Sequence, residues 1–350
     1  MKSLYLLLAF VPLAIGAEVL HASPIVIFLL SSAAIVPLSG LLGNATEQLA
    51  GHAGSTVGGL LNATLGNFAE LVIAGFALRA GMVDLVKGSI TGSIIGNLLL
   101  VLGAAQLAGG LKYKTQVVNP NLAGMSSTLL VVAVIGLVLP AVFHAVHPDP
   151  ARIATVQMST WISGLLIIGY VLSLVYSMWT HKAAFSEGGD VAHHESPPDW
   201  SLRKSLVILV VVAATIGVLS EFLVSSTEEA VKSLGLSQIF VGLIVIPIIG
   251  NAAEHSSAVF MAMKNRMDLA VGIAVGSSIQ VALLVAPLLV FLGLALGRPM
   301  DLAFTTLEVA SVALAVAVAS SVMRDNESNW LEGTFLLLAY AAIAVTFFFY

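Results

Sequence analysis

The chain has 350 residues, of which 58% are hydrophobic and 9% are charged, with a formal net charge of −5 and a mean hydropathy of +1.02. Soluble domains carry about 25% charged residues, so this composition indicates an integral membrane protein with little water-facing structure. The acidic balance excludes a basic nucleic-acid-binding surface, and the absence of cysteine excludes disulfides, iron–sulfur clusters and thiolate metal sites.

A helix needs about 20 apolar residues to cross the hydrocarbon core of a bilayer. In chain order, the apolar runs between polar punctuation predict eleven spans: 3–20, 24–48, 53–80, 83–110, 121–145, 152–180, 203–232, 237–263, 267–296, 301–323 and 329–350. We expect the first run to be a retained helix rather than a cleaved signal peptide. The reason is that "IGAEVLHAS" is a poor cleavage site and another span follows at once.

The basic residues are divided unevenly between the two sides of this map. Nine Lys and Arg fall on the side of the N-terminus and five on the other side. The positive-inside rule then predicts that the N-terminus is cytoplasmic and the C-terminus is outside. The polar segment 182–202 is predicted to be a solvated cytoplasmic linker, since no fixed ligand spacing supports a cation sensor there.

The chain contains an internal repeat. A shift of 184 residues aligns 58–103 with 242–287 without a gap, and 16 of the 46 positions are identical. The shift carries span three onto span eight, five crossings later, so the second copy is inverted in the membrane. Inverted repeats are a recurrent plan of secondary transporters, with the site near the midplane. We therefore predict an all-α fold of eleven transmembrane helices: a leading helix (1–22), a five-helix repeat (23–181), the linker (182–202) and an inverted five-helix repeat (203–350).

Glu70 and Glu254 match in this alignment, and both lie deep within expected spans. A charge at the bilayer centre costs at least ~2.5–3.5 kcal/mol, so such residues usually face the protein interior and mark ion or proton paths. No Lys or Arg lies mid-span to neutralise them, which leaves bound cations or bound protons. Without the metal, burial and mutual repulsion favour protonation, so protons and a divalent cation compete. A pair of permanently protonated acids is the alternative.

Other oxygen-bearing side chains accompany the two acids. Asn67 and Asn251 precede them by three residues, which places each amide on the same helix face as its Glu. Such a set suits a hard cation like Ca²⁺. The next spans contain "TGSIIGN" (91–97) and "GSSIQ" (276–280), whose glycines permit close approach or a local helix break. These stretches supply the further candidate ligands Ser93, Asn97, Ser277 and Gln280, for which interhelical hydrogen bonding is the alternative role.

Three more residues are candidates for supporting roles. His255 has no counterpart in the first copy, where Leu71 stands, and is a candidate proton relay because imidazole titrates near neutral pH. A hydrogen bond beside the site is its alternative role. Glu47 and Glu228 lie near the ends of spans two and seven, where they either line an entrance or are solvated helix ends.

With these residues in place, the chain resembles the calcium/cation–proton antiporters, the CAX family of the cation/Ca²⁺ exchanger superfamily. "GGLLNATLGNFAELVIAGFAL" (58–78) is similar to the first signature of that family and "GNAAEHSSA" (250–258) to its second. "GSSIQVALLVAPLLV" (276–290) is similar to the helix that follows, and the Glu-His pair separates the family from the Na⁺/Ca²⁺ branch.

The resemblance implies eleven helices, with Glu70 and Glu254 as the exchanging carboxylates. It places His255 beside them, and around the cation it places Asn67, Asn251, Ser277 and Gln280. Together with the repeat symmetry, it also implies that spans two and seven slide against a core of spans three, four, eight and nine.

The sequence thus favours a Ca²⁺/H⁺ antiporter that expels Ca²⁺ from the cytoplasm, with the two ions as substrates, the lipid bilayer as surroundings and no cofactor. A Na⁺/Ca²⁺ exchanger is the nearest alternative, disfavoured by His255 and by the uncharged Gln280. A passive cation channel is the alternative of another class, and the matched inverted acids argue against it. An intramembrane enzyme is not expected, because no HExxH motif or Ser/Lys dyad is readable.

Overall fold

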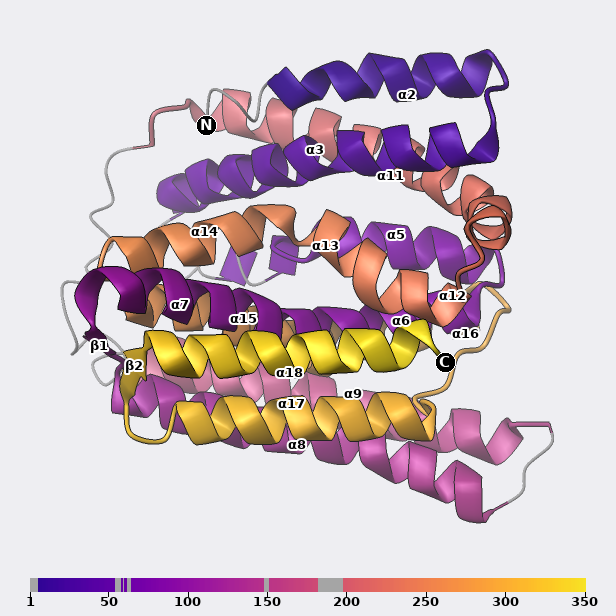
Figure 1. Cartoon of the computed structure of the whole chain (residues 1–350). Coiled ribbons are helices and arrows are strands. Elements are labelled where there is room, and N and C mark those ends of the chain that lie inside the picture. The colour runs from indigo at the N-terminus through magenta and orange to yellow at the C-terminus, as the bar shows by residue number, and fades with distance from the viewer. Residues whose placement is uncertain (1–5, 54–57, 59, 62–63, 148–150, 182–197) are drawn as a thin grey trace. The chain divides into compact units, whose positions relative to one another are not determined.

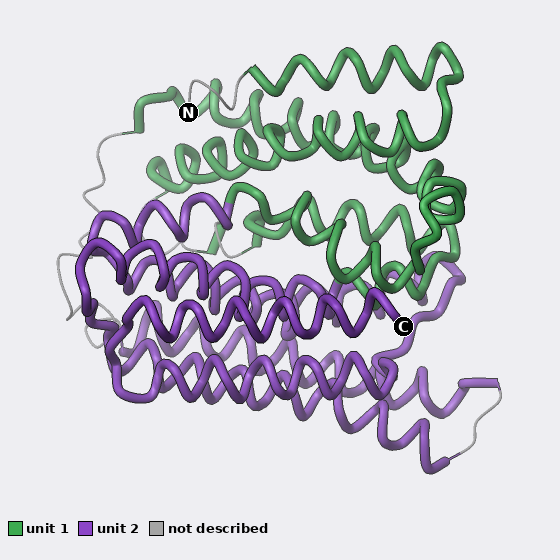
Figure 2. The backbone as a smooth tube through the Cα atoms, viewed as in Figure 1, with its two compact units in different colours: residues 1–89, 192–253 green, residues 90–191, 254–350 purple. Residues whose placement is uncertain are grey.

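The computed structural model describes residues 6–53, 58, 60–61, 64–147, 151–181 and 198–350 (Figure 1). Most of the predicted linker at 182–202 lies outside these ranges. By its internal contacts the chain divides into two compact units (Figure 2). Unit 1 comprises residues 1–89 and 192–253, and unit 2 comprises residues 90–191 and 254–350. Each unit therefore combines a stretch of the first predicted repeat with a stretch of the second.

Unit 1 is built on two long helices that pack along each other, α3 and α11 (Figure 1). Their contact is apolar and closely packed, with Ile35 and Leu42 on α3 and Ile216, Leu219 and Leu223 on α11 all buried. The helix α5 packs on α11, and a π-helical segment, Val241–Val245, joins α12 to α13. The helices of the unit are α2 (Phe10–Val19), α3 (Pro24–Ala53), α5 (Phe68–Arg79), α11 (Leu202–Leu234), α12 (Gln238–Phe240) and α13 (Ile246–Gly250).

Unit 2 holds the other helices and a short two-stranded ribbon. Strand β1 (Thr115–Val117) pairs antiparallel with β2 (Glu327–Asn329), with Gln116 opposite Ser328. The helices of the unit are α7 (Leu102–Tyr113), α8 (Pro120–Val146), α9 (Ile153–Val175), α15 (Met267–Gln280), α16 (Ala286–Ala295), α17 (Thr306–Val322) and α18 (Trp330–Phe348). Two more helices, α6 (Val83–Ile95) and α14 (Ala252–Met263), begin in unit 1 and continue into unit 2.

Glycines let α7 and α18 approach closely in unit 2. A Cβ on Gly103 would lie 2.9 Å from the backbone oxygen of Gly333, so these two helix backbones are in direct contact. Small residues are the usual means by which membrane helices pack, because lipid provides no hydrophobic drive for their association. These two glycines therefore serve helix packing.

Each of the eleven predicted runs contains a helix. Within the described residues, seven helices are long and apolar enough to cross a membrane, and the bent pair Gln238–Gly250 with Ala252–Met263 brings the number to eight if it is counted as one span. The segments Leu7–Val19 and Thr306–Val322 are apolar but shorter. The predicted span 301–323 begins late, because residues 301–305 form a loop and α17 starts behind the N-cap Thr305.

Candidate functional site

Both signature Gly-Asn pairs lie at helix interruptions. Gly66 and Asn67 form a turn directly before α5, and Asn251 separates α13 from α14, where the chain bends by 61°. The prediction of continuous spans over 53–80 and 237–263 is therefore wrong at these two points. Gly and Asn tolerate non-helical backbone better than other residues, which explains why the interruptions fall there. Irregular backbone at membrane depth occurs only where it is buried in protein or lines a cavity.

The two carboxylates occupy the same position after these interruptions. Glu70 is the third residue of α5 and Glu254 is the third residue of α14, so each lies in a first helical turn. The N-terminus of a helix carries a partial positive charge and unsatisfied N–H groups, both of which favour a carboxylate. The interruption thus lowers the cost of a buried negative charge.

In unit 1, Glu70 lies against the second signature. Its Oε1 accepts a hydrogen bond of 2.6 Å from Nδ2 of Asn251. A Cβ on Gly250 would lie 2.8 Å from Cγ of Glu70, so only glycine leaves room for this side chain. Glu70, Asn67 and Asn251 are all buried. The expectation that Asn251 shares a helix face with Glu254 is wrong, because Asn251 lies in the break and its amide turns to Glu70.

In unit 2, Glu254 and His255 are half-buried in the first turn of α14. Within the described part of the chain, Nε2 of His255 is buried and has no hydrogen-bond partner. A buried imidazole nitrogen that is not engaged is available for a proton or for a neighbouring polar group. Both roles considered for His255, a proton relay or a hydrogen bond beside the site, stay predictions.

The helices that follow the carboxylates meet in unit 2 through their polar side chains. Nδ2 of Asn97 donates to Oγ of Ser277 at 3.1 Å, and Oγ of Ser278 donates to the backbone oxygen of Ile94 at 3.3 Å. Ser93, Asn97 and Ser277 are buried, whereas Gln280 is half-buried. The structure thus brings Asn97 and Ser277 together, although the shift of 184 residues matches Ser277 with Ser93 and Asn97 with Val281.

A π-helical segment follows at the same place in each repeat. Gly96–Val101 continues α6, and Val281–Val285 continues α15. The shift of 184 residues superposes these two segments almost end to end. Of the two roles considered for Gly92 and Gly276, close approach or a local helix break, the break is absent, because both glycines lie inside regular helix. π-Helical turns are uncommon and occur frequently at functional sites.

Glu47 and Glu228 are both exposed in unit 1. Glu228 forms an ion pair of 2.8 Å with Lys232, one turn later on α11. Among the described residues, neither carboxylate forms a hydrogen bond or an ion pair with Glu70 or Asn251.

The far end of α14 is fixed in unit 2 by residues that the sequence did not single out. Nε2 of Gln116 donates to the backbone oxygen of Ala262 at 2.9 Å and to Oδ1 of Asn265 at 3.0 Å. Nζ of Lys112 and the hydroxyl of Tyr113 donate to the backbone oxygen of Met263. The last carbonyls of a helix lack partners within it, so these donors cap α14 at the end opposite Glu254.

Most of the candidate residues would ligate a metal ion through oxygen atoms. Carboxylate, amide and hydroxyl oxygens predominate, which is the ligand class of a hard cation. Among the described residues no three His, Cys, Asp or Glu side chains gather in one place. The candidate residues therefore offer two carboxylates and several neutral oxygens as possible ligands of a hard cation.

Comparison with known proteins places the chain in a transporter family. The sodium/calcium exchanger protein family model matches residues 23–179 and 204–349, which together are most of the chain. The Ca²⁺/H⁺ antiporter of Aphanothece halophytica is 44% identical over 356 aligned positions, covering 98% of this chain and 95% of the relative. The Ca²⁺/H⁺ antiporter of Synechocystis sp. is 42% identical and covers 100% of this chain and 98% of the relative.

The fold is also shared with a solved structure. The structure of native YfkE is 36% identical to this chain, covers 99% of both chains and superposes with a TM-score of 0.85. The similarity extends over both units and both signatures, so no large part of the chain falls outside it.

Proposed function

The chain belongs to the Ca²⁺/H⁺ antiporter family of the sodium/calcium exchanger superfamily, and from that premise we propose how its residues carry out the exchange. It is an integral, multi-pass membrane protein and a secondary transporter, not an enzyme, and its transported substrates are Ca²⁺ and H⁺. The bilayer-spanning plan that we propose has eleven crossings, with a leading helix at 1–22, inverted repeats at 23–181 and 203–350, and a linker at 182–202.

We propose that Glu70 and Glu254 ligate the same Ca²⁺. Their combined charge balances one divalent cation or two protons, which is the requirement for exchange at one site. The supporting observation is the 2.6 Å bond from Asn251 to Glu70. Asn251 precedes Glu254 by three residues, so chain connectivity alone keeps their Cα atoms within about 11 Å of each other. The proposed neutral ligands are Asn67, Asn251, Ser93, Asn97, Ser277 and Gln280.

Competition between the two ions couples their movement. Ca²⁺ binds the ionised carboxylates, and protons replace it because buried, mutually repelling carboxylates without a cation favour protonation. His255, present only in the second copy, is proposed to relay the proton. Alternating access of the site to the two sides then exchanges Ca²⁺ for protons across the membrane. We place the N-terminus in the cytoplasm and the C-terminus outside, with Ca²⁺ moving outward against incoming protons.

The decisive experiment compares ion gradients in proteoliposomes that contain the whole chain. Uptake of ⁴⁵Ca²⁺ is expected with an imposed pH gradient and not with a Na⁺ or K⁺ gradient alone. Glu70→Gln and Glu254→Gln are expected to abolish uptake, whereas Glu327→Gln, an exposed acid on β2, leaves it unchanged. Uptake driven by Na⁺ alone would identify a Na⁺/Ca²⁺ exchanger, and uncoupled, non-saturating flux would identify a channel. Retained transport in Glu254→Gln would remove that carboxylate from the site.

A further inference from the structure

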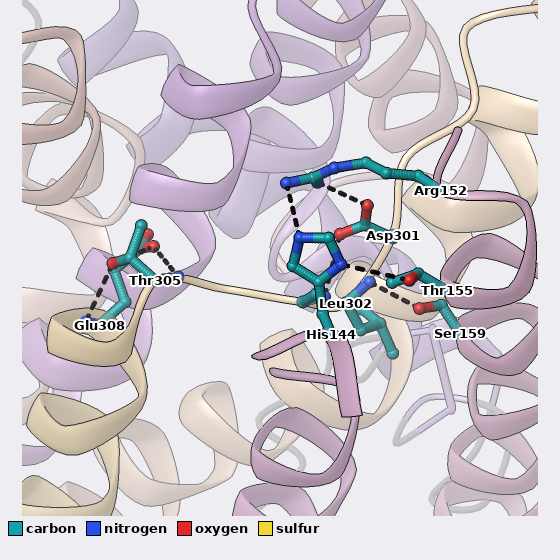
Figure 3. Close-up of polar contacts among 9 residues, drawn as sticks. His144, Arg152, Thr155, Ser159, Asp301, Leu302, Thr305 and Glu308 are labelled. Atoms are coloured by element: carbon teal, nitrogen blue, oxygen red, sulfur yellow. Dashed lines mark hydrogen bonds and ion pairs between the residues drawn. The ribbon is translucent and has the colours of Figure 1, made fainter. Parts of the chain in front are cut away.

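Glu308 is a carboxylate that the exchange proposed above does not use. It is 1% exposed, in the first turn of α17. Its Oε2 accepts hydrogen bonds from the N–H and the hydroxyl of Thr305, at 2.9 and 2.8 Å (Figure 3). With the return bond from the Glu308 N–H to the Thr305 hydroxyl, this is a capping box. A capping box needs only these local bonds, so it does not account for the burial of its carboxylate.

The other oxygen of Glu308 reaches a different helix. Its Oε1 accepts a hydrogen bond of 3.2 Å from the hydroxyl of Thr91, a buried residue of α6 that lies 217 positions earlier in the chain. A helical threonine commonly donates to a carbonyl of its own helix, four residues back. Thr91 instead donates to α17, and the bond joins the two helices within unit 2.

Thr91 precedes two of the candidate ligands. Ser93 follows two residues later in α6, and Asn97, which donates to Ser277, follows six residues later in the π-helical segment Gly96–Val101 that continues the helix. All side chains of a helix move together when the helix rotates about its axis. A small rotation of α6 would therefore turn Ser93 and Asn97 away from the positions that they need as cation ligands. The π-helical segment Gly96–Val101 begins immediately after α6 and widens the helix there. A fixed point at Thr91 therefore sets the rotation with which α6 enters this segment.

Glu308 itself is held by an anchored loop. Oδ2 of Asp301 accepts from Arg152 at 2.7 Å, and the N–H of Leu302 donates to the hydroxyl of Ser159 at 2.9 Å (Figure 3). Arg152 is the N-cap residue of α9, and Ser159 is the seventh residue of that helix. The loop 301–305 is thus attached to α9 at its beginning, and at its end Thr305 caps α17. Glu308 therefore has little freedom to move with Thr91.

We infer that Glu308 is a positioning residue for Ca²⁺ exchange, which acts through Thr91 on the rotation of α6. The inference rests on the proposed function, because it takes Ser93 and Asn97 as cation ligands. The internal repeat does not predict the bond between Thr91 and Glu308, since Val275 stands at the position that matches Thr91.

The sharpest test is Thr91→Val, which removes the hydroxyl and leaves the capping box intact. The Ca²⁺ concentration for half-maximal uptake should rise about three- to tenfold, the usual effect of one lost hydrogen bond, with the maximal rate within about twofold of wild type. Thr91→Ser should restore the wild-type value. Thr128→Val is the matched control, because that exposed hydroxyl donates only within its own helix, to Gly124.

Ca²⁺ binding to the detergent-solubilised protein, measured by titration calorimetry, separates the two proposals. Weaker Ca²⁺ binding in Thr91→Val that Thr91→Ser reverses would support the inference. Absence of proton-driven uptake by the wild type would refute the proposed function and would leave this binding result in place. An unchanged half-saturating concentration and unchanged binding in Thr91→Val would overturn the inference. A fall in maximal rate alone, with the half-saturating concentration unchanged, would also overturn it.

Discussion

Nδ2 of Asn251 donates a hydrogen bond of 2.6 Å to Oε1 of Glu70, although the two residues are 181 positions apart. Each copy of the internal repeat carries its own Gly-Asn and its own Glu, yet here the amide of the second copy serves the carboxylate of the first. The two signatures are therefore interlocked. The bond uses Nδ2 of the amide, whereas Oδ1 is the atom of Asn251 that is able to ligate a cation.

Removing this amide should weaken Ca²⁺ binding. Asn251→Ala deletes a donor to a buried carboxylate, and hydrogen bonds to charged groups are worth about 1.5–3 kcal/mol. We expect the half-saturating Ca²⁺ concentration for uptake to rise roughly ten- to hundredfold. Asn44→Ala on α3 serves as the control. A wild-type Ca²⁺ dependence in Asn251→Ala would show that the bond is dispensable for transport.

The glycine beside this bond should tolerate no side chain. In Gly250→Ala the new Cβ would lie 2.8 Å from Cγ of Glu70, so the carboxylate must move or the helix ends must separate. We expect proton-driven Ca²⁺ uptake to fall at least about tenfold, because transport sites lose activity steeply when a ligand is displaced. Gly217→Ala on α11 is the matched control, since its Cβ would meet no atom within 4 Å. Equal activity in the two variants would contradict the close packing of Glu70 against Gly250.

The helical segments could be predicted from the sequence because a bilayer leaves the backbone few choices. Each N–H and C=O in hydrocarbon must be satisfied within the chain, so an apolar run of sufficient length becomes a helix. The same argument fails at Gly66 and at Asn251, where protein surroundings permit irregular backbone. It also fails at residues 301–305, where the bonds of Asp301 and the Thr305 cap delay the start of α17.

The candidate site was only partly predictable from the sequence, because its contacts join segments that lie far apart in the chain. The alignment of the two copies identifies Glu70 and Glu254, because expensive polar residues that recur in register are informative. It does not reveal that Asn251 turns to the other copy, since partner choice depends on packing between segments far apart in the chain. Gln116 gave no signal, and Glu308, an acid within an expected span, lacks a matched constellation in the repeat. Both residues act through contacts made across more than 140 residues.

The exposed acids provide a test of the entrance hypothesis. Glu228 and Lys232 have side chains that are 60% and 70% exposed, and exposed pairs contribute about 0–1 kcal/mol to stability. Glu228→Gln should therefore leave the melting temperature unchanged. If Glu228 attracts Ca²⁺, the variant should slow uptake about two- to threefold at low ionic strength and not at high salt, where charges are screened. Lys232→Gln should have the opposite effect, and Glu47→Gln should resemble Glu228→Gln. Rates that are identical at every salt concentration would leave both acids as solvated helix ends.

Lys112, Tyr113 and Gln116, which cap the far end of α14, are called the clamp here. The clamp should control how firmly Glu254 is held. Gln116 is buried, and its Oε1 lies directly over Gly109, where a Cβ would overlap with it. Gly109→Ala should therefore push the amide from the carbonyl of Ala262 and leave that carbonyl unsatisfied, which costs about 1–3 kcal/mol. We expect a lower melting temperature and weaker Ca²⁺ binding, and the same for Gln116→Leu.

A double variant tests whether the two substitutions break the same contact. Gly109→Ala combined with Gln116→Leu should be little worse than either change alone, because residues that share one interaction are not additive. Gly124→Ala on α8, whose Cβ would meet no atom within 4 Å, should behave as wild type in both assays. Additive losses in the double variant would mean that Gly109 serves only helix packing. Loss of stability with unchanged Ca²⁺ binding would mean that the clamp supports the fold without reaching Glu254, eight residues away along α14.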